Sequence, residues 1–322
     1  MKPLQLVATG AFLLAHGFAS AQASYPSKPI TLVLGFPPGG GADAVARPLA
    51  EALGRELGQA VIVENKPGAG TTIASTFVSR AAPDGYTIYM AGVSHMGPDK
   101  VLYKNTTYSA SSFTSIARWT RTPLILAVSG ASGINSTKDL IDKAKANPEG
   151  LFYTSSGAGG APHLAALQFM NATGVKMTHL PFKGGAPAVQ AVAAGDAQLT
   201  FGTPPSIIPL AQTGKVKMIA VTSANRSSSF PELPSIAEAG VKDYDYTFWF
   251  GLFGPAKMPR EIVNRLAEAS AKVLGDPAMR AKLAAGGNEA SPSKNAAEFA
   301  AWTQAEAKLA TELTVQSGAK LD

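Results

Sequence analysis

The 322-residue sequence contains no cysteine, which excludes several kinds of protein at once. Without thiols the chain can form no disulfide bond, no thiolate metal site and no cysteine nucleophile, and it cannot carry a lipid on a cysteine at a processing site. A chain of this length can bury a sizeable core without disulfides. We therefore expect its stability to come from ordinary packing.

Charged residues are also scarce, at 16% of the chain against 46% hydrophobic residues, which indicates a globular rather than a disordered protein. The net charge is +6, but lysine and arginine are scattered singly, with no dense run and few aromatic neighbours. Nucleic-acid binding needs a concentrated basic patch, so we expect no nucleic-acid partner. A mild positive excess suits an anionic ligand.

Residues for catalysis or metal binding are sparse. The chain has four histidines, no H-E-x-x-H motif and no G-x-S-x-G motif. The pairs Ser94-His95 and Ser156…His163 are only neighbours in sequence, and adjacency alone does not make a catalytic triad. We therefore expect no enzyme, no metal site and no cofactor.

The N-terminal residues have the layout of a secretory signal. Met1-Lys2 gives a positive start, residues 4–18 are mostly apolar, and residues 19–23 contain two overlapping A-x-A patterns. The apolar run is too short for a spanning helix. We expect a cleaved signal peptide over residues 1–23 and a soluble mature protein in the periplasm; an uncleaved membrane anchor is the alternative.

The mature sequence begins with strand–helix units. The apolar, β-branched run 30–34 predicts a buried strand, and apolar residues at four-residue spacing over 45–57 predict an amphipathic helix. Pro48 lies inside this pattern and should kink the helix or delay its start. The alternation continues, and it favours a parallel sheet covered on both faces. The next elements expected are a strand at 60–63, a helix at 71–81 and a strand at 86–90.

Two long extended segments interrupt this rhythm, at residues 116–128 and 244–253. They flank a second, self-contained strand–helix series, and the Ala-rich region from Arg260 onward is nearly all helical in pattern. We predict two lobes joined by two crossings, with the C-terminal helices returning to the first lobe. The expected boundaries are lobe 1 over 24–122 plus 248–322 and lobe 2 over 123–247.

Three glycine-rich loops, at residues 36–43, 155–162 and 182–187, each open a predicted helix. Glycine lets a ligand approach the backbone amides closely, and free amides together with the helix dipole favour an anion. A single loop of this kind is equally compatible with an empty turn. His163 is either a ligand contact or a packed, hydrogen-bonded histidine, and Lys183 is either a charge near the cleft or a solvated lysine.

The first loop also allows a dinucleotide-dependent enzyme as an alternative. Residues 39–44 match the G-x-G-x-x-A pattern, and Glu64 is placed where a ribose-binding acid would be expected. Export, the separation of the glycines from the strand by Pro37 and Pro38, and the proline at position 48 all argue against this alternative.

Longer motifs occur in a recognisable order along the chain, from Tyr25-Pro-Ser-Lys-Pro-Ile30 and Phe36-Pro-Pro-Gly-Gly-Gly-Ala-Asp43 to Ser155-Ser-Gly-Ala-Gly-Gly-Ala-Pro-His163 and Trp249-Phe-Gly-Leu252. Together they resemble the Bug family, the periplasmic solute receptors of tripartite tricarboxylate transporters. The resemblance covers essentially the whole mature chain. As a set these motifs are highly specific, although each one alone is weak.

The resemblance implies an α/β protein with the two-lobed, type II periplasmic-binding-protein (Venus-flytrap) fold, each lobe being a mainly parallel sheet flanked by helices. It implies a carboxylate held between two glycine-rich helix starts, partly through ordered waters. The residues carried over from the family as ligand contacts are Phe36, Gly39, Gly40, Ala42, Asp43, Ser94 and His95 in lobe 1, and Ser155, Ser156, Gly157 and Gly160 in lobe 2.

One departure from the family concerns residues 201–203. Family members often carry an acid there that can meet an amino group of the ligand, whereas this chain has Gly202 and Thr203, the latter at the cleft. We therefore expect a ligand without an amino group, such as a dicarboxylate or an aromatic acid. The implied function is capture by lobe closure and delivery to a membrane permease, by a monomer. An exported carboxylate sensor for a membrane kinase is the main alternative.

Overall fold

The computed structural model describes residues 25–36, 38–39, 41–182 and 184–320. The predicted signal peptide therefore lies outside the described residues. Within the described ranges, no helix combines the length and the apolar character that crossing a bilayer requires.

Six of the described strands form a first sheet in the order β11-β4-β10-β3-β1-β2. Their bounds are β1 Ile30–Leu34, β2 Val61–Asn65, β3 Thr87–Ala91, β4 Phe113–Pro123, β10 Thr247–Pro255 and β11 Glu289–Ala290. Five further strands form a second sheet in the order β7-β6-β8-β5-β9. These are β5 Ile125–Ser129, β6 Phe152–Ser155, β7 Thr178–Pro181, β8 Leu199–Gly202 and β9 Val216–Val221.

Both sheets are mixed, so the expectation of mainly parallel sheets was wrong. β1 is parallel to β2 and β3, and β6 is parallel to β7 and β8. β10 runs antiparallel to β3 and β4, and β5 runs antiparallel to β8 and β9. The chain enters and leaves the second sheet through extended segments. Two consecutive strands that are parallel neighbours need a long crossover, usually a helix. The extended segments between β4 and β5 and between β9 and β10 contain no helix.

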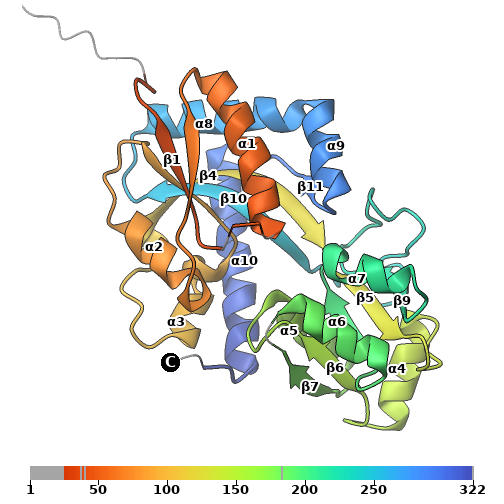
Figure 1. The fold of residues 1–322 in the computed structure, drawn as a ribbon. Coiled ribbons are helices and arrows are strands. Elements are labelled where there is room, and N and C mark those ends of the chain that lie inside the picture. Colours follow the sequence, from red (N-terminus) through yellow and green to blue (C-terminus); the bar gives the residue numbers. More distant parts are fainter. Residues whose placement is uncertain (1–24, 37, 40, 183, 321–322) are drawn as a thin grey trace, which may run out of the picture.

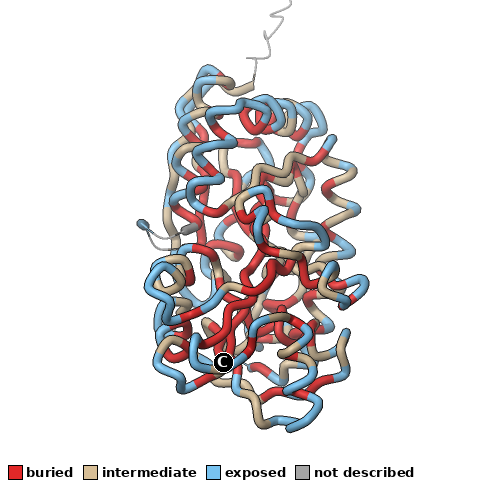
Figure 2. The backbone as a smooth tube through the Cα atoms, turned by 90° about the vertical axis from the view of Figure 1, so that its right-hand side faces the viewer, coloured by how far each residue is buried: buried red, intermediate tan, exposed pale blue. Residues whose placement is uncertain are grey.

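Helices flank both sheets (Figure 1). Those beside the first sheet are α1 Gly41–Leu57, α2 Thr72–Ser79, α3 Pro98–Leu102, α8 Arg260–Gly275, α9 Pro277–Ala285 and α10 Ala296–Gln316, with short 3-10 turns at η1 Ala69–Thr71, η2 Ser94–Met96 and η3 Ala110–Ser112. Those beside the second sheet are α4 Thr137–Ala146, α5 Ala161–Thr173, α6 Gly185–Ala194 and α7 Pro204–Ala211. Buried residues run through the interior of both halves (Figure 2).

Helix α1 shows how the four-residue apolar spacing directs packing. Val45, Leu49 and Leu53 are each 1% exposed and belong to the core of the first half. The helix begins at Gly41 and continues through Pro48, so of the two expected effects the delayed start was wrong and the kink stays a prediction. A proline inside a helix deprives the carbonyl four residues earlier of its partner, and here that residue, Ala44, is exposed to solvent.

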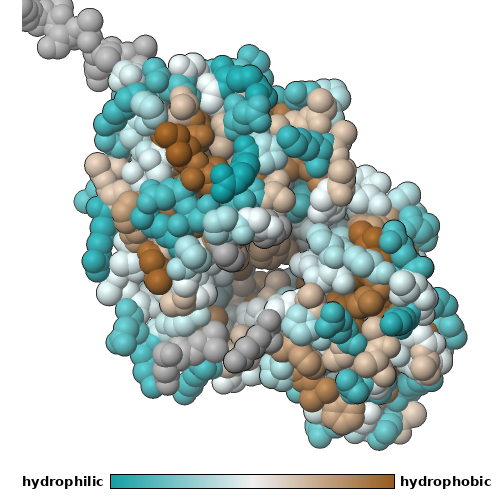
Figure 3. Space-filling model, viewed as in Figure 1, coloured by the Kyte–Doolittle hydropathy of each residue, from teal (hydrophilic) through white to brown (hydrophobic). Residues whose placement is uncertain are grey.

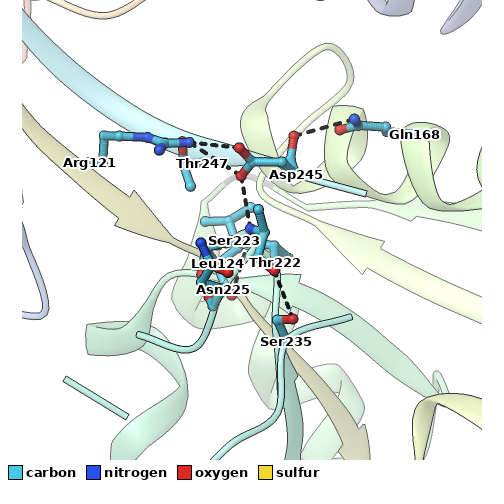
Figure 4. Close-up of polar contacts among 10 residues, drawn as sticks. Arg121, Leu124, Gln168, Thr222, Ser223, Asn225, Ser235, Asp245 and Thr247 are labelled. Atoms are coloured by element: carbon cyan, nitrogen blue, oxygen red, sulfur yellow. Dashed lines mark hydrogen bonds and ion pairs between the residues drawn. The ribbon is translucent and has the colours of Figure 1, made fainter. Parts of the chain in front are cut away.

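The two crossings between the halves run side by side. Only Leu124 separates β4 from β5, and its N–H donates to Thr222 Oγ1 at 2.7 Å while its carbonyl accepts from the Thr222 N–H at 3.0 Å (Figure 4). The Tyr246 N–H in turn donates to the Thr222 carbonyl at 2.8 Å. We propose that these crossings divide the lobes at the boundaries expected from the sequence.

Helix α10 makes a further contact between the halves. Leu313 near its end packs with Leu164 and Leu167 of α5 in one apolar cluster. The Asn171 side chain also bonds the Gln316 side chain at 2.7 Å. The C-terminal helix therefore packs on the first sheet and also contacts α5 of the second half.

Replacement of Gly251 by alanine tests the packing of the first half. An added Cβ would lie 2.2 Å from Cζ of the buried Phe299 and 3.1 Å from the Ala117 carbonyl oxygen. We expect Gly251→Ala to lower the free energy of unfolding by about 1–3 kcal/mol, because overpacking a buried site forces neighbours to move. Gly275→Ala is the control, since nothing lies within 4 Å of its added Cβ. Urea unfolding measures both variants, and equal stability of the two would refute this account.

Candidate functional site

A hollow lies between the two halves of the molecule (Figure 3). A cavity of about 110 Å³ lies at this junction, and its walls come from both halves. Among the residues expected to bind the ligand, Ser94 from the first half and Gly160 from the second line this cavity. The other expected contacts that the structure describes are not part of its lining.

The first glycine-rich loop is organised by Asp43, whose side chain is buried. Its Oδ2 accepts from the Gly39 N–H at 3.0 Å and from Arg47 Nε at 2.8 Å, and its Oδ1 accepts from Asn65 Nδ2 at 3.2 Å. The hydrogen bond from Arg47 is the largest of several effects that lower the pKa of Asp43 to about 2. Asp43 therefore fixes the loop with its carboxylate, as expected of an acid in the first turn of a helix.

The remaining expected contacts of this loop are its backbone and Phe36. Phe36 packs edge-to-face on Phe250, with ring centroids 5.9 Å apart. The amides of Ala42 and Asp43 lie in the first turn of α1, where no intrahelical acceptor exists for them. Gly40, another expected contact, lies outside the described residues.

His95 lies inside an aromatic cluster. Its side chain is 2% exposed and packs edge-to-face on Phe113 and Phe253, with ring centroids 4.6 and 4.5 Å away. Burial lowers the pKa of His95 to about 3, against a smaller opposing effect of the Gly92 backbone. The imidazole is therefore neutral, and a direct contact of its ring with the ligand stays a prediction.

The second glycine-rich loop is held by the Ser155 hydroxyl. This side chain is 1% exposed, lies 2.7 Å from His179 Nε2 and accepts from the Gly157 N–H at 3.2 Å. Gly157 has a φ of +139°, which favours glycine. Ser155 thus orders the loop, and residues 156–160 that follow it are all partly exposed.

The stacked rings of His163 and His179 pack beside this loop and bond it. His163 Nδ1 accepts from the Gly159 N–H at 3.0 Å, and its ring lies 3.8 Å from that of His179, with 15° between the planes. Burial, and then the charge of His179, lower the pKa of His163 to about 4. Burial also lowers the pKa of His179. Both rings are neutral near pH 7, and His163 is the packed histidine that the sequence allowed.

His179 was missed from the sequence because it is distant in the chain from the loop that it supports. The parallel register pairs it with Tyr153, two residues before Ser155. A strand alignment that placed β7 beside β6 would have found it. Four residues of α10 that line the cavity were also missed, because their Ala-rich helix gave no sign of a binding role: Glu306, Leu309, Ala310 and Leu313.

The third glycine-rich loop and Thr203 complete the edge of the second sheet. Lys183 lies outside the described residues. Thr203 is the N-cap of α7, and its hydroxyl pairs with Ser206 Oγ at 3.0 Å. A Cβ at Gly202 would lie 2.8 Å from Cδ1 of the buried Ile207, so this position leaves no room for a side chain. Neither position supplies an acid.

In the described part of the chain, the loops of the candidate site offer backbone amides and side-chain hydroxyls rather than metal ligands. No group of three or more His, Asp or Glu residues that could hold a metal ion occurs in the described part of the chain. Helix starts that present free amides are suited to binding an anion.

The chain matches known receptors along most of its length. The family described as the tripartite tricarboxylate transporter family receptor matches residues 45–317. An R. palustris protein solved with adipate is 32% identical, with a TM-score of 0.78 over 92% of this chain and 100% of that one. MatC from Rhodopseudomonas palustris, solved with malate, is 27% identical, with a TM-score of 0.73 over 90% of this chain and 100% of that one.

A curated relative agrees with these structures. The BugT protein of Bordetella pertussis is 29% identical over 294 residues, which are 88% of this chain and 88% of that protein. These matches confirm the two-lobed fold expected from the resemblance. Because the family match spans most of the described residues and the relatives align over nearly their full length, the chain belongs to the tripartite tricarboxylate transporter receptor family.

Proposed function

We propose that this protein is a periplasmic receptor that binds a small organic carboxylate between the starts of α1 and α5 and delivers it to a membrane permease. The observation that carries the proposal is that Ser94 and Gly160, one from each half, line a single cavity. Family relatives were solved with adipate and malate, which are both carboxylates.

The binding chemistry relies on backbone amides and hydroxyls. Arg47, one turn after Asp43, is bonded to the Asp43 carboxylate rather than left unpaired for a ligand. Free first-turn amides and the helix dipoles then supply the positive potential for an anion. A carboxylate that bonds both helix starts stabilises the closed arrangement, because it makes these contacts together only there.

A binding role accounts for the serine and histidine side chains better than catalysis does. Ser155 and His179 are within hydrogen-bond distance, but the hydroxyl is buried and bonded within its own loop. The possible dinucleotide acid, Glu64, pairs with Lys66 Nζ at 2.6 Å. The protein acts in this proposal as a monomer, without turnover of its ligand. A sensor role would use the same site and would differ only in its membrane partner.

Replacement of Ser156 tests the site. We expect Ser156→Leu to abolish most of the thermal stabilisation that a bound carboxylate gives to the wild type, because a bulky apolar side chain beside the α5 start excludes an anion. Native mass spectrometry of the purified protein identifies the co-purified ligand for this assay. Ser79→Leu, at the end of α2, is the control and should retain the stabilisation. Equal stabilisation in the Ser156 variant would remove that residue from the site.

Acidification tests the neutral histidine support. An unfolded histidine takes up a proton near pH 6.5 and folded His163 only near pH 4, so its contribution to stability is complete above pH 6.5 and is lost as the pH falls toward 4. Burial raises the pKa of Asp99 to about 6, which acts in the opposite direction. We therefore compare wild type with His163→Gln in urea unfolding from pH 7 to 4. The wild type should lose more stability, and parallel profiles would contradict this.

A further inference from the structure

The cavity between the halves has an apolar part that extends beyond the expected contacts. Leu102 of α3, Leu164 of α5 and Leu313 of α10 line it, and all three are buried. Trp249 of β10, at 2% exposed, adds an aromatic wall. Three helices and a crossing strand therefore present hydrocarbon surface to one small space.

This apolar part lies directly behind the start of α5. Gly160 and Ala161 line the same cavity as Leu164, and Leu164 is four residues further along the helix, or about 6 Å at the usual helical rise. Leu102 approaches from the other half, since a Cβ on Gly159 would lie 2.9 Å from Leu102 Cδ2. An anion held at the α5 start would have its carbon chain beside these leucines.

Two of the charged groups that line the cavity, Arg121 and Asp245, bond each other. Arg121 donates to both carboxylate oxygens of Asp245, at 3.2 and 2.9 Å, and to Thr247 Oγ1 at 3.0 Å (Figure 4). Burial raises the pKa of Glu306, while the charge of Arg121 and a hydrogen bond with Trp249 partly oppose this shift. Among the described residues the cavity therefore holds one guanidinium, which is paired with Asp245, and two carboxyl groups, so its fixed charges disfavour a second ligand carboxylate.

We propose that this cavity is a subsite for the uncharged end of the ligand, so that the receptor takes a monocarboxylate with an aliphatic tail. The inference rests on the proposed function and narrows its ligand class. A cavity of about 150 Å³ holds a benzene ring. The smaller space here, about 110 Å³, suits a chain of a few methylene groups better than a ring. A terminal carboxylate would meet Glu306 and Asp245 without a free partner.

Calorimetric titration with matched ligands tests this subsite. Hexanoate and adipate have the same six-carbon chain and differ in one end, and 6-aminohexanoate places a cation there instead. We expect hexanoate to bind about 60-fold more tightly than propionate, because each of three further buried methylene groups contributes about fourfold. Hexanoate should also exceed adipate and 6-aminohexanoate by at least about tenfold.

The outcomes separate the two proposals. Tighter binding of adipate or of 6-aminohexanoate than of hexanoate would overturn the apolar subsite and leave carboxylate binding intact. Propionate binding as tight as hexanoate would do the same, because the tail would then lie outside the cavity. Failure of all four ligands, with no carboxylate found by native mass spectrometry, would instead overturn the proposed function itself.

A pair of variants in α10 locates the subsite. Ala310 lines the cavity, whereas the equally buried Ala307, one turn earlier, does not. Ala310→Leu should weaken hexanoate at least about tenfold and leave propionate within about twofold, because the added carbons fill the tail space only. Ala307→Leu should leave both affinities unchanged. Equal loss of both ligands in the Ala310 variant would contradict the assignment, and the wild-type ligand series remains decisive if either variant fails to fold.

Discussion

The hydrogen bonding of Leu124 to Thr222 is the constraint on which the rest of the structure depends. Through Thr222, whose carbonyl also accepts from the Tyr246 N–H, it joins the two extended crossings where the chain passes between the sheets. In the proposed receptor, this joint would confine rotation of the halves to one narrow region. Rotation there would open and close the space between the halves.

Two acids near the candidate site are each paired with an arginine. Asp43 is bonded by Arg47, and Asp245 is bonded by Arg121. Each arginine bonds a further side chain besides its acid, Asn65 for Arg47 and Thr247 for Arg121. In the proposed site a ligand anion would bind amides and hydroxyls, which are directional. Such groups discriminate shape more strongly than a mobile lysine ammonium would, because they cannot follow a misplaced ligand.

The sequence predicted those parts of the fold that depend on local patterns. The four-residue spacing of Val45, Leu49 and Leu53 predicted α1, and the two extended segments predicted the crossings. The sequence did not predict the parts of the fold that depend on contacts between residues distant in the chain. The strands that pair antiparallel carry no local mark of direction, so the sheets were expected to be mainly parallel. Pro48 was expected to kink the first helix or to delay its start, and the packed helix begins at Gly41.

For the candidate site, the glycine loops were visible in the sequence but their internal bonding was not. The Ser155 hydroxyl was expected to face a ligand, and its nearest polar partner is His179, which enters from a neighbouring strand. Nothing in the spacing of these two residues marks them as neighbours, because strand order is set by the packing of the whole sheet. The same holds for His95, whose aromatic neighbours Tyr89, Phe113 and Phe253 come from β3, β4 and β10.

The hinge and the cavity share residues, and this links ligand size to closure. Asp245 belongs to the second crossing, where its Oδ1 also accepts from the Ala224 N–H at 3.1 Å and its carbonyl accepts from Gln168 Nε2 of α5 at 3.3 Å (Figure 4). The residue thus connects Arg121 of the first sheet, the crossing itself and the helix whose start faces the ligand. In the proposed receptor, rotation of the halves would move α5 relative to Arg121 and so alter the walls of the cavity. A tail that fits these walls at one angle between the halves would favour that angle, so recognition of the tail and closure would be coupled.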